Sequence, residues 1–324
     1  MRALASPASC KGVLSAVEAA MALAAGMRSV GLDADELPVA DGGEGTAEVF
    51  AASLGGEWRT ASVSDPLGRP VAARFLVLED GTAVLEAAEA IGLRRLAEGE
   101  RHPLVASSRG LGELLLAAAG GAAGPLLVGL GDSATVDGGA GLLDVVGEEL
   151  TGRKLQALCD VRNPLLGERG AARAFGPQKG ASRADVEELE ARLAGLEELR
   201  PYAELPGAGA AGGLGAAIAS LGGELVSGAE LVLDRVGFRA QAEGVDLVVT
   251  GEGTVDRSSV EGKAVGEVGR ICRELGVRCA VFGGRVDEPV PGAEMRALSG
   301  DPTRAADDLV ELGEELAGAL LGFA

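Results

Sequence analysis

The sequence predicts an α/β protein in which helices pack on both faces of mainly parallel sheets. Short apolar strands alternate with amphipathic helices along the chain, which is the pattern of this class. Hydrophobic residues make up 47% of the 324 residues, so a sizeable core can form, and 52 glycines supply many tight loops. This length allows one large domain or two ordinary ones.

The first elements follow a strand, turn, helix order. Residues 2–6 are apolar and predict a strand, and Ser15 with Glu18 forms a capping box that predicts the start of a helix. The apolar positions expected on one face of this helix are Val17, Met21, Ala24 and Met27. A glycine-rich acidic loop at 38–46 opens a second helix, and residues 63–77, with a turn at 65–68, predict a hairpin.

The rest of the chain repeats the alternation. Further strands are expected at 82–85, 126–129, 157–161, 245–249 and 279–282. Helices are expected at 112–119, after Gly141, after Ser182 with its cap partner Asp185, after the 206–215 segment, and up to Gly276. The last twenty residues predict an acidic amphipathic helix that packs on its own domain through Leu309, Leu312, Leu316 and Leu320. Glu86, at the end of a predicted strand, is read as a solvated strand edge.

Composition excludes several functions. The net charge of −20 repels nucleic acid and anionic membranes, and only 2% of residues are aromatic, which argues against base-stacking surfaces. The sole histidine, His102, excludes a His-rich zinc site. No apolar stretch is long enough to span a bilayer, no signal peptide is evident, and four cysteines without a CxxC pair indicate a reducing cytoplasm. An anion site here must be built locally from backbone N–H groups, a few cations and a divalent metal.

Lysine usage points to such a site. The chain has only four lysines against twenty-five arginines, and Lys11, Lys179 and Lys263 each lie beside a glycine in a turn-like segment. A compact ammonium approaches phosphate or carboxylate from any angle, whereas a guanidinium needs room for a planar fork. Glycine beside it lets backbone and ligand come close. Codon bias is the competing explanation.

Acidic residues recur in glycine-rich loops between a strand and a helix. Ligands gather at the carboxyl ends of strands in open α/β sheets, and the N-terminus of the next helix favours an anion. The loops of this kind surround Lys11, Asp41, Asp137, Glu252 and Lys263, and Asp160 follows another short strand. Together they would supply cations for phosphate and carboxylates for Mg²⁺ or general-base work. For each acid, a turn or helix-cap role is the alternative.

Known phosphate motifs do not match. Residues 262–264 (GKA) lack the earlier glycine and the following hydroxyl of a Walker A loop. Residues 129–134 (GLGDSA) imitate a dinucleotide fingerprint, but no acidic end of a second strand follows at the required distance. A dinucleotide-dependent oxidoreductase is therefore the least supported function.

Six segments, in order along almost the whole chain, together resemble the type I glycerate kinases. They are PVADGGEGT at 38–46, GGAG at 138–141, CDV with NPL within 159–165, FGPQKG at 175–180, PGAGAAGGLG at 206–215, and TGEGTVD with GK within 250–263. The resemblance implies transfer of the γ-phosphoryl group of ATP, with Mg²⁺, to D-glycerate. The product would be 2-phosphoglycerate rather than 3-phosphoglycerate, and the partners would be these small molecules, with no nucleic acid or membrane.

The resemblance also implies a domain organisation and roles for single residues. It implies a flavodoxin-like α/β domain at 1–60 and 240–324, a second α/β domain inserted at 61–239, and an active site in the cleft between them. The implied base near the glycerate hydroxyl is Asp160, acting with Lys11 and Asp41 as the catalytic set. Residues implied to bind ATP or substrate are Glu44, Ser133, Thr135, Asp137, Lys179, Glu252, Asp256 and Lys263. Asp41 and Glu252 are also the metal candidates.

The first loop departs from the family pattern. That loop usually reads DSFKGSLS, whereas residues 8–15 are ASCKGVLS, so Ala8 and Val13 replace an acid and a hydroxyl. Val136 stands where an asparagine is usual, and the middle and C-terminal segments are short. The alternative function is therefore a catalytically weakened relative that binds a nucleotide or a small acid. The sequence does not indicate the oligomeric state.

Overall fold

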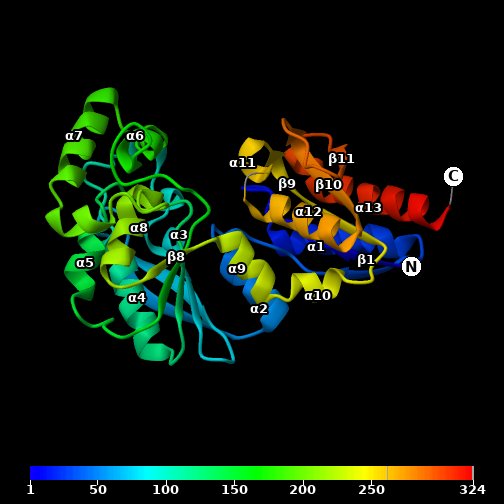
Figure 1. Cartoon of the computed structure of the whole chain (residues 1–324), viewed down its shortest axis with the longest axis horizontal. Helices are drawn as coiled ribbons and strands as arrows, with labels where there is room; N and C mark the ends of the chain where they lie inside the picture. The colour runs from blue at the N-terminus through cyan, green and yellow to red at the C-terminus, as the bar shows by residue number, and fades with distance from the viewer. Residues whose placement is uncertain (261, 323–324) are drawn as a thin grey trace. The chain divides into compact units, whose positions relative to one another are not determined.

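The structure, a computed structural model, describes residues 1–260 and 262–322. Contacts within the chain divide it into two compact units (Figure 1). Unit 1 comprises Met1–Asp41, Glu48–Leu54 and Ala229–Ala324, and unit 2 comprises Gly42–Ala47 and Gly55–Gly228. Both are α/β structures, which confirms the predicted fold class.

Unit 1 is built on a parallel five-stranded sheet in the order β11-β10-β9-β1-β2. The strands are β1 (Arg2–Ala5), β2 (Asp33–Glu36), β9 (Leu247–Val255), β10 (Arg278–Val286) and β11 (Glu294–Ala297). β1 pairs with β2 on one side and with β9 on the other, with Leu4 opposite Asp35 and Val248. Counted along the chain within the unit, this order is the flavodoxin-like 2-1-3-4-5. The expected flavodoxin-like architecture is confirmed.

Two helices cover one face of this sheet. Alternate strand residues, among them Ala5, Val249 and Phe282, pack in one core with α1 (Ala16–Ser29) and α13 (Ala305–Leu321). These two helices lie side by side (Figure 1). A Cβ on Gly26 would lie 2.0 Å from the carbonyl oxygen of Val310, so only glycine permits this approach. The opposite face carries α12 (Ala264–Leu275) against β9 and β10. Unit 1 also contains α10 (Phe238–Ala242), α11 (Arg257–Val260) and, from its second residue, α9 (Gly228–Arg235).

The structure confirms the capping box of α1 and changes its buried face. Ser15 accepts a hydrogen bond from the Glu18 backbone, and the Glu18 carboxylate accepts one from Ser15 in return. Met21 is 54% exposed, so its assignment to the packed face was wrong. The buried stripe instead consists of Ala16, Ala19, Ala20, Leu23, Ala24, Gly26 and Met27. Small residues decide this face because α13 approaches closely there.

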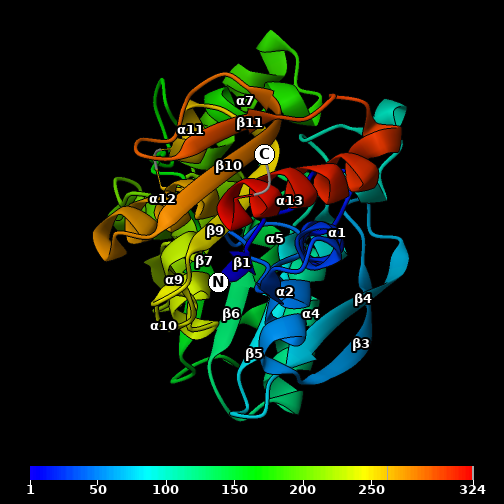
Figure 2. The same ribbon diagram turned by 90° about the vertical axis from the view of Figure 1, so that its right-hand side faces the viewer.

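Unit 2 has a mixed six-stranded sheet in the order β3-β4-β5-β6-β7-β8. The strands are β3 (Glu57–Ser64), β4 (Pro70–Val77), β5 (Ala83–Glu86), β6 (Leu126–Gly129), β7 (Leu155–Leu158) and β8 (Glu224–Val226). β3 and β4 form the antiparallel hairpin predicted around its turn (Figure 2). From β5 to β8 all neighbours are parallel.

Helices flank the unit 2 sheet and complete two cores. They are α3 (Ala87–Ile91), α4 (Arg109–Gly121), α5 (Ala140–Val146), α6 (Ala171–Phe175), α7 (Arg183–Ala194) and α8 (Ala210–Ser220), while α2 (Thr46–Leu54) begins in unit 2 and continues in unit 1. One core joins the sheet to α4, α5 and α8, and a second joins α6, α7 and α8. Short 3-10 turns occur at η1 (Leu93–Arg95), η2 (Glu98–Glu100), η3 (Pro177–Lys179), η4 (Glu197–Tyr202) and η5 (Pro302–Arg304).

Two strands run further than expected. β9 and β10 stay paired to Val255 and Val286, so Glu252 lies within a strand rather than in a loop after it.

Strand β2 was not predicted, because its sequence DADE has no apolar alternation and only Ala34 is buried. No helix among the described residues could cross a membrane. The domain boundaries expected from the sequence stay a prediction.

Candidate active site

Unit 1 contains a pocket of about 480 Å³ at the carboxyl ends of its strands. It lies where the strand order reverses, between β1 and β9, which is where ligands bind in open α/β sheets. Its walls come from the loop after β1, the ends of β9 and β10, the loop after β11 and the start of α13. Four residues expected from the sequence line it: Lys11, Glu252, Asp256 and Lys263.

Three glycines bring the strand ends close together along this pocket. A Cβ on Gly284 would lie 2.9 Å from the carbonyl oxygen of Gly253, and one on Gly253 would lie 3.6 Å from the Cα of Cys10. Gly300 has a φ of +77°, and a Cβ there would lie 3.5 Å from the Gly284 carbonyl oxygen. The chain segments therefore follow one another across the pocket in the order β1, β9, β10, β11.

The pocket's two lysines lie near the β1–β9 end. Lys11 is exposed in the loop after β1, and Lys263 is the N-cap residue of α12. The first backbone N–H groups of a twelve-residue helix carry partial positive charge that favours an anion. Both lysines sit beside glycine in the sequence. This end of the pocket has the chemistry of a phosphate site.

Glu252 is the half-buried acid of the pocket. Burial raises the pKa of this carboxyl above its usual value, and the neighbouring carboxylates of Asp41 and Asp256 raise it further. A hydrogen bond with Ser259 and the charge of Lys263 act in the opposite direction. Its Oε1 atom is buried and has no hydrogen-bond partner. An unpartnered buried carboxylate oxygen is costly unless a ligand, ion or water completes it.

Asp256 is held in place locally. Its Oδ1 accepts hydrogen bonds from the Ser258 backbone at 2.8 Å, the Ser258 hydroxyl at 2.6 Å and the Ser259 backbone at 3.2 Å. These bonds lower the pKa of Asp256 and cap the short helix α11. Asp256 is therefore ionised beside Lys263, and its Oδ1 already accepts hydrogen bonds within the chain.

The acids of unit 1 supply few ligands for a divalent metal ion. Among the described residues, no group of three or more His, Cys, Asp and Glu side chains could hold a metal ion. Mg²⁺ usually takes only one or two protein carboxylates and completes its shell with phosphate oxygens and water. The open oxygen of Glu252, with Asp41 close enough to affect its pKa, fits that mode of binding.

In unit 2, Lys179 is buried rather than open to solvent. It is only 3% exposed, and its ammonium donates hydrogen bonds to the Ser133 hydroxyl at 3.0 Å and the Thr135 carbonyl at 2.8 Å. Burial lowers its pKa to about 7, and the negative charges of Asp137 and Asp132 offset part of the effect of burial. Lys179 thus ties η3 to the loop that holds three of the predicted residues.

Asp137 organises the start of α5. Its carboxylate accepts hydrogen bonds from the Ser108 backbone and hydroxyl, both at 2.8 Å, from the Gly139 backbone at 3.1 Å and from the Gly141 backbone at 3.3 Å. This is the helix-cap role that was the alternative for acids beside glycine. A ligand role for Asp137 stays a prediction.

Asp160 lies two residues after β7 rather than within the strand, and it too faces a helix start. Its Oδ1 accepts hydrogen bonds from the Ser227 hydroxyl at 2.8 Å and from the backbone of Gly228, the first residue of α9, at 3.0 Å. These contacts fix the orientation of the carboxylate. Its role as a base stays a prediction.

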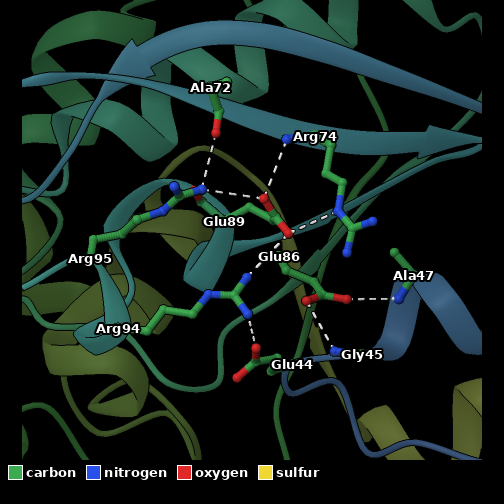
Figure 3. A network of polar contacts seen from close by, with 9 residues as sticks. All are labelled: Glu44, Gly45, Ala47, Ala72, Arg74, Glu86, Glu89, Arg94 and Arg95. Atoms are coloured by element: carbon green, nitrogen blue, oxygen red, sulfur yellow. Dashed lines mark hydrogen bonds and ion pairs between the residues drawn. The ribbon is translucent and has the colours of Figure 1, made fainter. Parts of the chain in front are cut away.

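Glu44 belongs to a charged network that the sequence did not indicate (Figure 3). Arg94 pairs with Glu44 and also with Glu89, the latter at 3.1 Å. Arg74 and Arg95 bind the same Glu89 carboxylate at 3.2 and 3.4 Å. One buried acid thus gathers three arginines next to the acidic glycine-rich loop.

Glu86 holds the same loop from another direction. Its two carboxylate oxygens accept hydrogen bonds from the backbone of Gly45 at 3.1 Å and of Ala47 at 2.8 Å (Figure 3). It is 5% exposed, so reading it as a solvated strand edge was wrong. A signal was available: an acid directly after the apolar residues 83–85 must find donors if it is buried.

The predicted residues are divided between the units. Unit 1 holds Lys11, Asp41, Glu252, Asp256 and Lys263, whereas unit 2 holds Glu44, Ser133, Thr135, Asp137, Asp160 and Lys179. Four of the unit 1 residues line the unit 1 pocket, and Asp41 lies outside its lining but close enough to raise the pKa of Glu252.

Comparison with known proteins identifies the family. The model of the glycerate kinase family matches residues 3–154 and 144–299. The chain belongs to the glycerate kinase family. This confirms the resemblance seen in the six segments, and the family name denotes a kinase, that is, a phosphotransferase.

Relatives of this family resemble the chain over most of its length. The glycerate 2-kinase of Escherichia coli K12 is 41% identical, covering 81% of this chain and 80% of its own. The glycerate kinase of Halalkalibacterium halodurans is 38% identical, covering 87% and 85%. A crystal structure of a candidate glycerate kinase 2 from Salmonella typhimurium LT2 superposes with a TM-score of 0.87 at 30% identity, covering 99% of this chain and 98% of that one.

Proposed function

We propose that this protein is an ATP-dependent kinase that transfers the γ-phosphoryl group to a hydroxyl of D-glycerate, with 2-phosphoglycerate as product. The observation that carries the proposal is the unit 1 pocket, where two lysines, a helix N-terminus and a half-buried carboxylate meet at the switch point. Phosphoryl transfer depends mainly on positioning and on neutralising charge, and these groups supply both. Four free cysteines fit action in a reducing cytoplasm.

Lys11 and Lys263 are proposed to bind phosphate oxygens. The molecule carries a net charge of −20, so an anionic substrate is repelled at long range and needs cations at the site itself. The N-terminus of α12 adds backbone donors next to Lys263. These groups would hold the transferring phosphoryl group in line with its acceptor.

Glu252 and Asp41 are the proposed residues for Mg²⁺, with Asp256 beside them. When bound, the ion would neutralise charge that develops on the phosphate oxygens. Glu252 offers its unpartnered Oε1, and the opposing charge of Lys263 helps to keep the carboxylate ionised.

Asp160 is proposed as the base that accepts the proton of the glycerate hydroxyl. The bonds from Ser227 and Gly228 orient its carboxylate and occupy Oδ1. Glu44, Ser133, Thr135 and Asp137 are proposed to border the substrate, and Lys179 holds the loop of Ser133 and Thr135. An Asp160→Asn variant that keeps full turnover would remove Asp160 as base.

The altered first loop does not disrupt the backbone of the site. The Ala8 N–H donates to the Gly251 carbonyl at 2.9 Å, a bond that needs no side chain, and Val13 lines the pocket as a 40% exposed residue. Only the side-chain acid and hydroxyl are lost. The remaining lysines and acids supply the charges that the proposal requires.

The test is direct. Purified protein is mixed with ATP, Mg²⁺ and D-glycerate, ADP release is followed, and the product is identified by NMR, with L-glycerate as the control. We expect turnover and 2-phosphoglycerate. Measurable ATP binding without turnover would reject the proposal and favour the catalytically weakened relative. 3-Phosphoglycerate would correct only the position of transfer.

A further inference from the structure

We infer that the nucleoside part of ATP binds at the β10–β11 end of the unit 1 pocket, against Leu298, Pro302 and Ala305, with its polyphosphate toward Lys11 and Lys263. The inference rests on the proposed function, in which the lysine end takes phosphate. It adds a nucleoside subsite and a direction for the bound nucleotide.

The size of the pocket supports a ligand larger than glycerate. Its volume of about 480 Å³ lies within the roughly 300–1,000 Å³ range of small-molecule sites. A three-carbon acid would fill only part of this space. A nucleotide is long enough to use both ends, since the lining extends from the loop after β1 to the first turn of α13.

The two ends differ in chemistry. Contacts between Cys10 and Gly253, Gly253 and Gly284, and Gly284 and Gly300 set the order of the strand ends across the pocket. Lys11 follows Cys10 at the first end. Lys263 also lies near this end, because its charge acts on the carboxyl of Glu252 in β9 and partly offsets the rise of the Glu252 pKa. The opposite end presents the aliphatic side chains of residues 298, 302 and 305. A polyphosphate suits the first end and a flat, uncharged base suits the second.

Charge at the aliphatic end also disfavours phosphate. Asp301 and Asp308 both line that end, and the pKa of each is lowered, so both are ionised at neutral pH. Arg285 lies there too, but it is paired with Asp287. Asp308 is likewise paired with Arg304, so Asp301 is the acid at this end that a phosphate group would meet. Ribose hydroxyls, in contrast, can donate hydrogen bonds to its carboxylate.

The loop that forms this end is already ordered. Asp308, on α13, accepts hydrogen bonds from the Ser299 backbone at 2.9 Å and from Arg304 at 3.1 Å. Asp301 accepts from the Thr303 backbone at 2.9 Å and from its hydroxyl at 2.7 Å. The loop between β11 and α13 is therefore tied at both ends before any ligand arrives, which reduces the ordering cost of binding.

A matched pair of variants tests the subsite. Ala305→Phe places a ring in the pocket, whereas Ala306→Phe makes the same change at the next residue, which is exposed and does not line the pocket. Binding of ADP and of tripolyphosphate to the full-length protein is measured by calorimetry, together with the KM values for ATP and D-glycerate. Thermal unfolding checks that each variant folds, and Ala305→Leu replaces the phenylalanine variant if it does not.

We expect Ala305→Phe to weaken ADP about ten-fold, close to 1.4 kcal/mol, and to raise the KM for ATP similarly. Tripolyphosphate affinity, the KM for D-glycerate and all constants of Ala306→Phe should stay at wild-type values. Unchanged ADP affinity in a folded Ala305 variant would overturn the inference. A loss of tripolyphosphate affinity as large as the loss of ADP affinity would also overturn it, and so would a wild-type protein that binds neither probe. If D-glycerate is not phosphorylated but ADP binding shows the expected pattern, the proposed function fails and the subsite stands.

Discussion

At the scale of single residues, the three lysines that lie beside glycine have two different surroundings. Lys11 and Lys263 line one pocket of unit 1, where a ligand can reach them. Lys179 is enclosed in unit 2 by Ser133 and Thr135. A compact ammonium suits both settings, since it can meet phosphate from any angle and can also fit where a guanidinium would not. We therefore expect different consequences when each lysine is replaced.

Replacing Lys263 tests the phosphate site. Lys263→Met removes a cation next to the α12 N-terminus, and we expect kcat/KM for ATP to fall by roughly 100-fold or more, the usual cost of one charge-stabilising group. Steady-state kinetics with varied ATP measures the change. The matched control is Lys154→Met, because Lys154 is exposed and lies outside the pocket. Equal activity of both variants would reject the phosphate role.

Replacing Glu252 separates its chemical role from its effect on stability. The pKa of this carboxyl is raised in the fold, so folding disfavours its ionised form. Stability is therefore greater at low pH and falls as pH rises from the usual value of 4.5 through the raised one. At pH 7, we expect Glu252→Gln to melt at a higher temperature than wild type but to lose phosphoryl transfer.

Melting temperatures of both proteins between pH 5 and 7.5 check this prediction. The difference between them should shrink toward the acidic end, because protonation of wild-type Glu252 increases as the pH falls. Glu288→Gln is the control, because Glu288 is exposed and does not line the pocket. A variant less stable than wild type at pH 7 would contradict the assigned cost of burial.

Lys179 should respond to pH in the opposite direction. Its pKa falls from 10.5 to about 7 on folding, so the unfolded chain binds the extra proton between these values. Stability contributed by Lys179 is therefore lowest below pH 7 and rises toward pH 10.5. In this window, we expect the free energy of unfolding of wild type to rise relative to that of Lys179→Met by at most ~1.4 kcal/mol per pH unit. Urea unfolding measures both values. A constant difference between the two proteins across the window would show that Lys179 stays protonated.

At the scale of elements, the start of α2 depends on a residue far away in the sequence. Glu86 at the end of β5 accepts hydrogen bonds from the Gly45 and Ala47 backbone N–H groups, about forty residues away along the chain. This contact holds the loop that carries Glu44. Local sequence rules find caps within a few residues and cannot find this one.

Removing the Glu86 carboxylate should loosen this helix start. Glu86→Ala leaves the two backbone donors without their acceptor, and we expect a loss of about 1–2 kcal/mol in the free energy of unfolding. Denaturant unfolding measures it, and Glu79→Ala, an exposed acid in the turn before β5, serves as the control. Equal stability of the two variants would mean that water or another group replaces Glu86. Glu86→Gln, which keeps an acceptor oxygen, should recover part of the loss.

Elements governed by local chemistry were predictable. The capping boxes at Ser15 and Ser182 form as expected, and the strand predicted at 126–129 matches β6. β2 escaped prediction because a polar edge strand lacks the alternation that marks a half-buried one. The exposure of Met21 was not predicted either, because the packing of α13 on α1, and not the apolar periodicity alone, determines which face of α1 is buried.

At the scale of the whole molecule, the chain leaves one compact unit, forms another and returns. β1 and β2 come from the beginning of the chain, and β9, β10 and β11 from its end, yet they form one sheet. Strand β1 has partners from both parts, β2 from the beginning of the chain and β9 from its end. Unit 1 therefore cannot form from either terminal part alone.

A fragment experiment tests this organisation into two compact units. Residues 55–228 contain both unit 2 cores, so we expect this fragment to unfold cooperatively on its own by circular dichroism. Residues 229–324 expressed alone should lack a stable sheet, because β9 then loses its β1 neighbour. A cooperative transition of the C-terminal fragment alone would contradict this view.

The sequence by itself determined the family, the α/β class and most helices and strands, because glycine loops, caps and apolar periodicity act over short distances. It also singled out Lys11, Glu252, Asp256 and Lys263. Only the tertiary structure decided that these four line one pocket, that Lys179 is enclosed, and that Glu86 caps a helix start. The reason is that these outcomes depend on strand order, burial and hydrogen bonds between residues far apart in the chain.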